Sequence, residues 1–223
     1  MSKISSRLEV LIKASDDLRY LLDRGYNKRS AIKLIGDRYI LDKDERLILY
    51  RAIYSKDEVE SVKKKRWDVM MLKDQRVLID GFNVLNTVEA ALRGEELILC
   101  DDGVIRDFSQ VYGRYRLTQQ TLVSISLMIE ALEESKVSEA CILYESQISR
   151  SGEIARQTRE IMRLKELNGR VETTKTVDSI LSKSDAVVCT SDSVILMKCK
   201  RFFDLAAYII SVKVESPKIL ELR

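Results

Sequence analysis

Histidine is absent from the 223 residues of this chain. Its absence excludes Ser-His-Asp and Cys-His catalysis, HExxH zinc sites and imidazole general bases. Any chemistry must come from carboxylates or from Lys, Tyr, Ser, Thr or Cys side chains. Glycine (8) and proline (1) are scarce as well. A chain so poor in turn-forming residues is predicted to be mostly regular structure, rich in helix.

Paired cysteines and long apolar runs are also missing. The four cysteines never fall in a CxxC pair, which argues against a structural zinc site, and three lie in or beside apolar strand-like runs. That placement is typical of buried, reduced thiols. No run approaches the ~18 apolar residues of a membrane span, and the first ten residues have no apolar signal core. We expect a cytoplasmic protein with no membrane partner.

The charge is distributed unevenly. Residues 1–76 hold 19 Lys and Arg against 13 Asp and Glu, whereas residues 77–223 hold 19 against 22. This asymmetry predicts a basic binding module joined to a module of another kind. The sharpest basic run lies near the join and suits either contact with a polyanion or a solvated connector; it comprises Lys63, Lys64, Lys65 and Arg66.

Residues 1–66 are predicted to form a small all-α domain. Leucines and isoleucines recur at three- and four-residue steps over residues 8–22, and residues 28–39 give a second helix. Asp42, with Glu45 three residues later, predicts a capping box that opens a third helix. Three short helices resemble a helix-turn-helix-sized bundle, a shape with many uses besides nucleic-acid binding.

From residue 76 to residue 223 the pattern changes to alternating strands and helices. Short apolar or β-branched runs predict strands buried in a parallel sheet; they cover residues 77–80, 140–145, 171–178 and 186–192. Helical stretches lie between them, at 117–132 and at 153–167, the second closed by Asn168-Gly169. The alternation predicts a doubly wound α/β domain. Asp102-Gly103 predicts a hairpin within residues 97–108.

Acidic residues end the predicted strands: Asp80, Glu145, Asp178 and Asp192. Strands of an open parallel sheet deliver their carboxyl ends to one edge, where ligands bind. Clustered carboxylates repel one another unless a cation neutralises them, and oxygen ligands without His or paired Cys suit Mg²⁺ or Mn²⁺. Such an ion could activate water for phosphodiester hydrolysis.

Each acid also has a simpler interpretation as a helix cap or turn residue. Asp80 is the strongest candidate, because Gly81 offers close approach and Asn83 offers an amide ligand or orienter. Asp192 is second. The predicted hairpin turn accounts for Asp102. Asp185 precedes its strand, where it suits either a cap or turn residue or a side chain that faces the crevice.

Two weaker candidates concern nucleic acid. A helix that opens at Ser151 carries an arginine stripe, which suits phosphate contacts or a solvated helix face; the stripe is Arg156, Arg159 and Arg163. Tyr112, Arg114 and Tyr115 suit stacking on nucleotides or packing in the core. The chain contains neither GxGxxG nor GxxxxGK[ST].

Two segments resemble a known superfamily. VLIDGFNVL (77–85) is similar to the opening strand of the PIN and NYN metal-dependent nucleases, and AVVCTSDSVIL (186–196) to a later strand that ends in [ST]xD. Together with residues 16–39, the whole chain resembles an uncharacterised archaeal family that joins a small helical domain to a PIN-like domain.

The resemblance implies a three-layer α/β/α sandwich with a mostly parallel sheet, and Mg²⁺- or Mn²⁺-dependent cleavage of RNA. By motif, Asp80 would be the first-strand metal ligand, Asp192 the later acid, and Asn83 the asparagine of NYN members. Glu145 falls at a strand end where such nucleases place another acid. The glutamate that PIN nucleases usually carry on a middle helix has no aligned counterpart here, and the hairpin at Asp102 is not a general PIN feature.

The leading prediction is therefore a metal-dependent ribonuclease whose basic helical module binds RNA. The alternative is a non-catalytic RNA-binding or ribosome-associated protein that keeps a degenerate PIN-like fold. A third is an interaction scaffold in which the acids serve only as caps. The sequence leaves the oligomeric state open, and a homodimer is one of the assemblies it allows.

Overall fold

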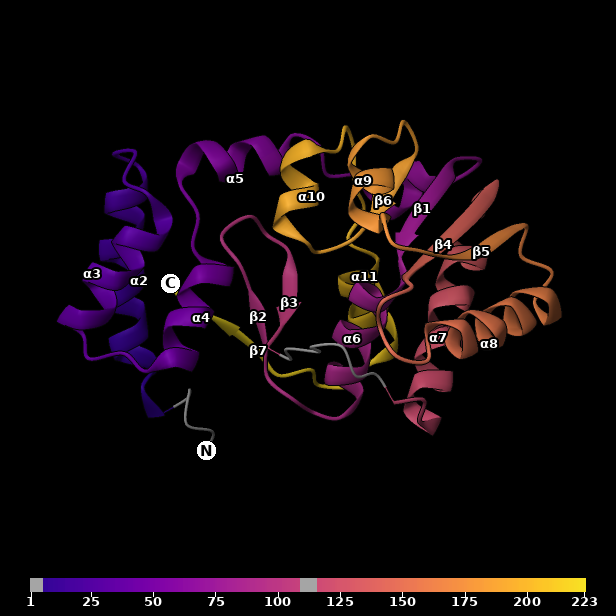
Figure 1. Cartoon of the computed structure of the whole chain (residues 1–223), viewed down its shortest axis with the longest axis horizontal. Helices are drawn as coiled ribbons and strands as arrows, with labels where there is room; N and C mark the ends of the chain where they lie inside the picture. The colour runs from indigo at the N-terminus through magenta and orange to yellow at the C-terminus, as the bar shows by residue number, and fades with distance from the viewer. Residues whose placement is uncertain (1–5, 109–115) are drawn as a thin grey trace.

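The computed structural model describes residues 6–108 and 116–223 (Figure 1). The described N-terminal residues form four helices: α2 (Leu8–Leu22), α3 (Lys28–Arg38), α4 (Lys43–Ala52) and α5 (Lys56–Lys63). The predicted capping box is confirmed, since Asp42 and Glu45 each accept the other's backbone N–H. Helix α5, which begins at a second capping box between Ser55 and Glu58, was not predicted.

The main sheet has four strands in the order β5-β4-β1-β6, and every neighbouring pair is parallel. The strands are β1 (Arg76–Asp80), β4 (Glu139–Glu145), β5 (Gly169–Thr174) and β6 (Val187–Cys189). This confirms the predicted mixed α/β architecture with a mostly parallel sheet. All four strands therefore end at the same edge of the sheet.

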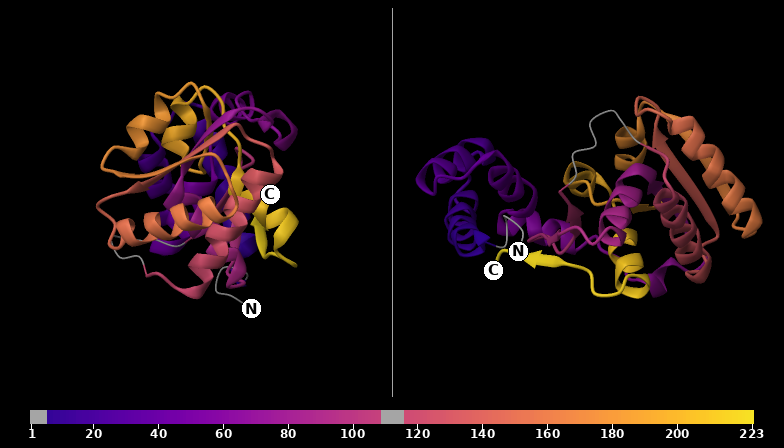
Figure 2. Two further views of the ribbon diagram at one scale, coloured as in Figure 1. Left: turned by 90° about the vertical axis from the view of Figure 1, so that its right-hand side faces the viewer. Right: turned by 90° about the horizontal axis from the view of Figure 1, so that it is seen from below.

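Helices cover both faces of this sheet (Figures 1 and 2). Val77 and Ile79 face a core shared with α6 (Gly81–Leu92), α7 (Gln119–Glu134), α8 (Ser151–Leu164) and α11 (Leu205–Lys213). Leu78, between them in β1, faces the opposite core, which is shared with α5, α9 (Val177–Ser182) and α10 (Ser193–Lys198). The alternation follows from the two-residue period of a strand, which turns neighbouring side chains to opposite faces.

A second sheet joins the helical part to the α/β part. Its order is β3-β2-β7, with β2 (Leu97–Leu99) antiparallel to β3 (Ile105–Asp107) and parallel to β7 (Ile219–Glu221). The predicted hairpin is thus confirmed, whereas β7 was not predicted. Ile98, Cys100 and Leu222 lie in the same core as α2, α3 and α4, so the helical bundle is packed against the hairpin. In Figure 1 this sheet lies between the two parts.

Several local predictions were wrong. The run 171–178 is not one strand: β5 ends at Thr174, and Asp178 lies in the first turn of α9. The helix predicted at 153–167 is α8, which ends at Leu164, and Gly169 begins β5 instead of capping the helix. Only residues up to Asp80 of the segment 77–85 are strand, because α6 begins at Gly81.

Three further predictions concern the cysteines, membrane-spanning helices and possible stacking residues. All four cysteines are buried free thiols. No helix within 6–108 or 116–223 is long and apolar enough to cross a membrane. The suggested stacking residues at positions 112, 114 and 115 lie outside the described residues. The short 3₁₀ helix Val69–Leu72 connects the helical part to β1.

Candidate functional site

Asp80 is the last residue of β1, and its carboxylate has defined partners. The register pairs Ile79 with Cys189 of β6, so the next residue of the neighbouring chain segment, Thr190, lies beside Asp80. The Thr190 hydroxyl donates to Asp80 Oδ2 at 3.0 Å. The backbone N–H of Asn83 donates to Asp80 Oδ1 at 3.4 Å, so Asp80 also caps α6. The carboxylate is therefore held in position from two sides.

Gly81 explains how a helix can begin directly after this strand. A Cβ atom at Gly81 would overlap the ring of Tyr144, a fully buried residue of β4. The Tyr144 hydroxyl is fixed by Thr158 of α8 at 2.9 Å, so the ring cannot move aside freely. The close approach predicted at Gly81 is thus one of the Gly81 backbone to the buried Tyr144 ring.

The loop from Thr190 to Asp192 is tied to the same edge. Thr190 Oγ1 accepts the backbone N–H of Asp192 at 3.1 Å, and Asn83 Oδ1 accepts both the N–H and the hydroxyl of Ser191, at 2.7 and 2.9 Å. Asp192 Oδ1 in turn caps α10. Of the two roles predicted for Asn83, the geometry favours the orienter, because its side-chain oxygen already accepts two hydrogen bonds.

The carboxylates at this edge interact electrostatically. Burial raises the pKa of Asp80 to about 7, with smaller contributions from the negative charges of Asp192 and Asp178; the hydrogen bonds from Thr190 and Asn83 lower the pKa but only in part. Burial, then Asp192 and Glu145, also raise the pKa of Asp178, although Lys198 opposes the rise. Asp80, Asp178 and Asp192 thus lie within range of one another's charge, and Glu145 acts on Asp178.

The acidic residues differ in their position at the sheet edge and in their exposure. Asp80 pairs in register with Leu143, so Glu145 lies two residues further along β4 and reaches the margin of the site. Its Oε1 accepts the backbone N–H of Gln147. Asp178 is exposed, and Asp192 is half-buried. Asp185, by contrast, lies at the surface in an ion pair with Lys200, and the Lys200 charge lowers the pKa of Asp185.

The chemistry of this donor set fits a hard divalent cation. In the described parts of the chain, no three His, Cys, Asp or Glu side chains are close enough to hold a metal ion among themselves. Magnesium does not require such a set, because it is usually held by one or two carboxylates and completes its shell with water and substrate oxygens. Asp80 and Asp192, whose mutual repulsion raises the pKa of Asp80, are suitable ligands of that kind.

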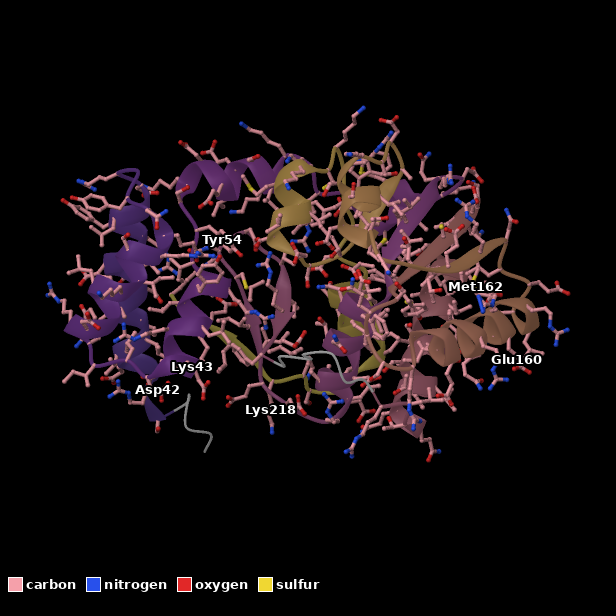
Figure 3. The ribbon with its side chains drawn as sticks, in the orientation of Figure 1. Asp42, Lys43, Tyr54, Glu160, Met162 and Lys218 are labelled. Atoms are coloured by element: carbon pink, nitrogen blue, oxygen red, sulfur yellow. The ribbon has the colours of Figure 1, made fainter. Side chains whose placement is uncertain are left out.

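A pocket of about 270 Å³ adjoins this edge. One wall comes from α4 and the residues that follow it, including Tyr50, Arg51 and Tyr54. The other comes from the starts of α6 and α10 and from β3, including Asn83, Asp107 and Asp192. We call it the interdomain pocket. Tyr54, labelled in Figure 3, follows α4, and the guanidinium of Arg106 lies 5.4 Å from its ring.

A buried ion pair supports the floor of the site. Arg106 of β3 binds Asp102 through two hydrogen bonds, of 2.6 and 2.9 Å, and donates from Nε to the Ser191 carbonyl at 2.7 Å. Both side chains are almost completely buried. Asp102 was predicted only as a turn residue; its carboxylate also accepts the Val104 N–H, as a turn residue would. The hairpin therefore fixes the loop that carries Asp192.

The predicted basic run is divided between two roles. Lys65 Nζ donates to the carbonyls of Leu196 and Met197 at the end of α10, and Arg66 donates to the Gly103 carbonyl. These two residues act as a connector between the domains. Lys63 and Lys64 are exposed, with Lys64 in a weak pair with Glu60 at 3.8 Å. The exposed side chains of Lys63, Lys64 and Arg66 remain accessible to a polyanion.

The arginine stripe lies on α8, on the far side of the main sheet from α9 and α10 (Figure 1). Arg156, Arg159 and Arg163 are all exposed. Arg159 donates to the Val171 carbonyl of β5 at 3.1 Å. Arg159 and Arg163 also line a pocket of about 280 Å³ together with Arg170. The stripe is thus a basic surface separate from the carboxylates.

Comparison with known proteins identifies the family. Residues 69–208 match the model of the Domain of unknown function (DUF5616). This chain belongs to that family. Residues 10–65 match a second model, the Protein of unknown function (DUF434). The Uncharacterized protein MJ0935 of the archaeon Methanocaldococcus jannaschii is 39% identical over 184 residues, which are 82% of this chain and 88% of the relative. No solved structure matches the chain significantly.

These comparisons confirm part of the predicted resemblance. The chain belongs to an uncharacterised family with an archaeal member, and the two models meet close to residue 66, at the end of the helical part. Neither description names an activity, so the PIN-like nuclease domain stays a prediction.

Several residues of the site were not found from the sequence. Thr190 is the first residue of the [ST]xD pattern, so its role had a signal in the motif. Arg51 and Tyr50 had none: both lie on a helix with an ordinary amphipathic pattern, and only the packing of this helix against the hairpin places them at the pocket. Asp204, a buried cap of α11 that also accepts the Ile105 N–H, likewise had no signal.

Proposed function

We propose that this protein is a metal-dependent ribonuclease, with a PIN-like α/β domain that hydrolyses RNA phosphodiester bonds at the carboxyl edge of the main sheet. The observation that carries the proposal is the state of Asp80. Its carboxylate is oriented by Thr190 and Asn83 but is desolvated and faces two other acids, which raises its pKa to about 7. A divalent cation would remove this electrostatic penalty.

In this proposal Asp80 and Asp192 hold Mg²⁺ or Mn²⁺, and Glu145 and Asp178 add negative charge at the margin. The ion, when bound, would supply the Lewis acid that activates water and stabilises the charge on the phosphate. The chain's own residues keep the ligands in place. Thr190 is hydrogen-bonded to both Asp80 and Asp192, and Asn83 holds the backbone of Ser191, which precedes Asp192. Such rigid support is what a hydrolytic site of this kind requires.

RNA is the proposed partner because the protein presents two exposed basic surfaces. Lys63 and Lys64 are exposed at the end of α5, and the α8 stripe presents Arg156, Arg159 and Arg163. Each contact of this type with a phosphate releases counterions and makes the affinity dependent on salt.

One observation favours the alternative, a non-catalytic RNA-binding or ribosome-associated protein. Asp80 and Asp192 both cap helices, α6 and α10, and a cap is sufficient reason for an acid at such a position. A protein of this kind would bind RNA without cutting it.

The test compares cleavage of labelled single-stranded and structured RNAs in Mn²⁺, Mg²⁺ or EDTA. The variants are the Asp80→Asn/Asp192→Asn double mutant and, as a matched control, Asp185→Asn, which removes an acid that lies outside the site. We expect metal-dependent cleavage by the wild type and by the control, and its loss in the double mutant. Cleavage that survives in the double mutant would contradict the assignment of the site. RNA binding without cleavage on every substrate would favour the alternative.

A further inference from the structure

The interdomain pocket has two walls of different chemistry. On the α/β side it shares Asn83 and Asp192 with the carboxylate edge. On the helical side it is lined by Tyr50 and Arg51 of α4. A molecule bound at the carboxylates would therefore extend directly into this pocket and against α4.

The α4 wall presents the guanidinium of Arg51. Arg51 is half-buried, and its Nη1 donates to the backbone carbonyl of Asp107 at 2.9 Å. None of the ion pairs between described residues involves Arg51, whereas Arg106, the other guanidinium of the pocket, is neutralised by Asp102. A guanidinium that is fixed at one nitrogen and forms no ion pair within the described part of the chain is suited to an anion such as phosphate.

The same wall presents an exposed aromatic ring. Tyr50 is 44% exposed although it lies one residue from the half-buried Arg51. The amino group of Lys28 lies 5.3 Å from the Tyr50 ring and adds positive charge behind the wall. A tyrosine ring beside basic groups is the arrangement on which unpaired bases stack.

The size of the pocket limits what can enter. Its volume of about 270 Å³ is slightly below the roughly 300–1,000 Å³ of pockets that enclose drug-sized ligands. A single nucleotide is of that size, and a base-paired helix is far larger. In addition, the bases of a duplex are stacked and paired, so none is available to Tyr50.

We infer that the interdomain pocket accepts one unpaired nucleotide of a single-stranded RNA, with its base against Tyr50 and its phosphate at Arg51. The inference rests on the proposed function for the identity of the polymer and extends it to the form of RNA that is recognised. It also gives the helical domain a role: α4 completes the binding site that the α/β domain begins.

The test measures the affinity of the full-length protein for a short fluorescein-labelled oligouridine by fluorescence anisotropy. EDTA is present, so binding is observed without cleavage. A hairpin RNA with a fully paired stem and a minimal loop is the competitor. The variants are Tyr50→Ala, Arg51→Gln and Arg51→Lys. Matched controls are Tyr20→Ala and Arg38→Gln, which change an exposed tyrosine and an exposed arginine of the helical part away from the pocket. Thermal melting verifies that every variant is folded.

We expect Tyr50→Ala and Arg51→Gln each to weaken binding of the single strand by about fivefold or more. Arg51→Lys should retain part of the affinity, and the two controls should stay within about twofold of the wild type. Wild-type affinity in Tyr50→Ala and Arg51→Gln would overturn the inference, as would equal affinity for the paired hairpin. The nuclease proposal fails separately: loss of binding in these variants without cleavage by the wild type would support the pocket and refute the catalysis. RNA cleavage that is unchanged in Tyr50→Ala and Arg51→Gln would support the catalysis and refute the pocket.

Discussion

The hydroxyl of Thr190 donates a hydrogen bond to Asp80 Oδ2 at 3.0 Å, across the boundary between two neighbouring parallel strands. Thr190 Oγ1 also accepts the backbone N–H of Asp192 at 3.1 Å. One buried hydroxyl thus sets the position of the carboxylate on β1 and of the loop after β6. Two acids 112 residues apart in the chain are placed relative to each other through this single group.

Replacing Thr190 with valine tests this link. Valine has nearly the same shape but cannot donate to Asp80 or accept from Asp192, so an N–H is left without its partner. We expect a loss of about 1–3 kcal/mol in the free energy of unfolding, measured by urea denaturation. The proposed nuclease activity should fall by about tenfold or more, because the two carboxylates lose their common anchor. Thr190→Ser, which keeps the hydroxyl, should retain most of both. A loss in Thr190→Ser as large as that in Thr190→Val would contradict a dominant role of the hydroxyl.

The raised pKa of Asp80 predicts the pH dependence of stability. Its pKa is about 7 in the folded protein, against an ordinary value of 3.8, so the folded protein binds this proton more tightly than the unfolded chain does. The free energy of unfolding should therefore fall as the pH rises from about 4 to about 7, by at most roughly 4 kcal/mol from this group. Asp178 and Asp204, whose pKa values are also raised by burial, act in the same direction.

Asp80→Asn removes this contribution. We expect the free energy of unfolding of the variant to depend less on pH between about pH 4 and pH 7. At pH 8 the variant should melt at a temperature equal to or above that of the wild type. Adding MgCl₂ at pH 8 should raise the melting temperature of the wild type more than that of the variant, because a ligand stabilises the state that binds it. A clear loss of stability in the variant at pH 8 would mean that Asp80 serves mainly as the cap of α6.

Gly81 should not tolerate a side chain. A Cβ atom there would overlap the Tyr144 ring, so Gly81→Ala should lower the free energy of unfolding by about 1–3 kcal/mol. Gly152 of α8 is the matched control: a Cβ atom there has no neighbour within 4 Å, and alanine should be neutral or stabilising, by up to about 1 kcal/mol. Chemical denaturation of both variants measures the difference. Similar values for the two would show that the ring of Tyr144 moves aside at little cost.

The buried pair of Arg106 and Asp102 predicts non-additive effects. Arg106→Met leaves the Asp102 charge buried without its partner, which should cost about 3–5 kcal/mol. The double variant Arg106→Met/Asp102→Leu removes both charges and should recover most of this loss. Both variants lose the hydrogen bond to the Ser191 carbonyl, so both should lose the proposed nuclease activity. Equal destabilisation of the single and double variants would contradict a dominant role of the unpaired charge.

Local patterns of residues were sufficient for several elements. The pairing of Asp42 with Glu45 indicated the start of α4, and Asp102-Gly103 indicated the turn between β2 and β3. Local patterns did not distinguish a strand from a helix where the residue types suit both. Residues 171–178 are rich in β-branched residues, and only the packing of Val177 against the sheet turns the last of them into α9. Helix α6 was missed because it begins at Gly81, directly after the last residue of β1, with no connecting segment to mark the boundary.

For the site, the sequence determined which residue types are available, and it placed Asp80, Glu145 and Asp192 at or just after the ends of strands. This much follows from chain order and side-chain chemistry. Only the tertiary structure decided which of them lie near one another, because that depends on the strand order β5-β4-β1-β6 and on its register. It also decided that Asn83 contacts Ser191 and that α4 forms a wall of the pocket. These contacts join residues far apart in the chain, and no local pattern specifies them.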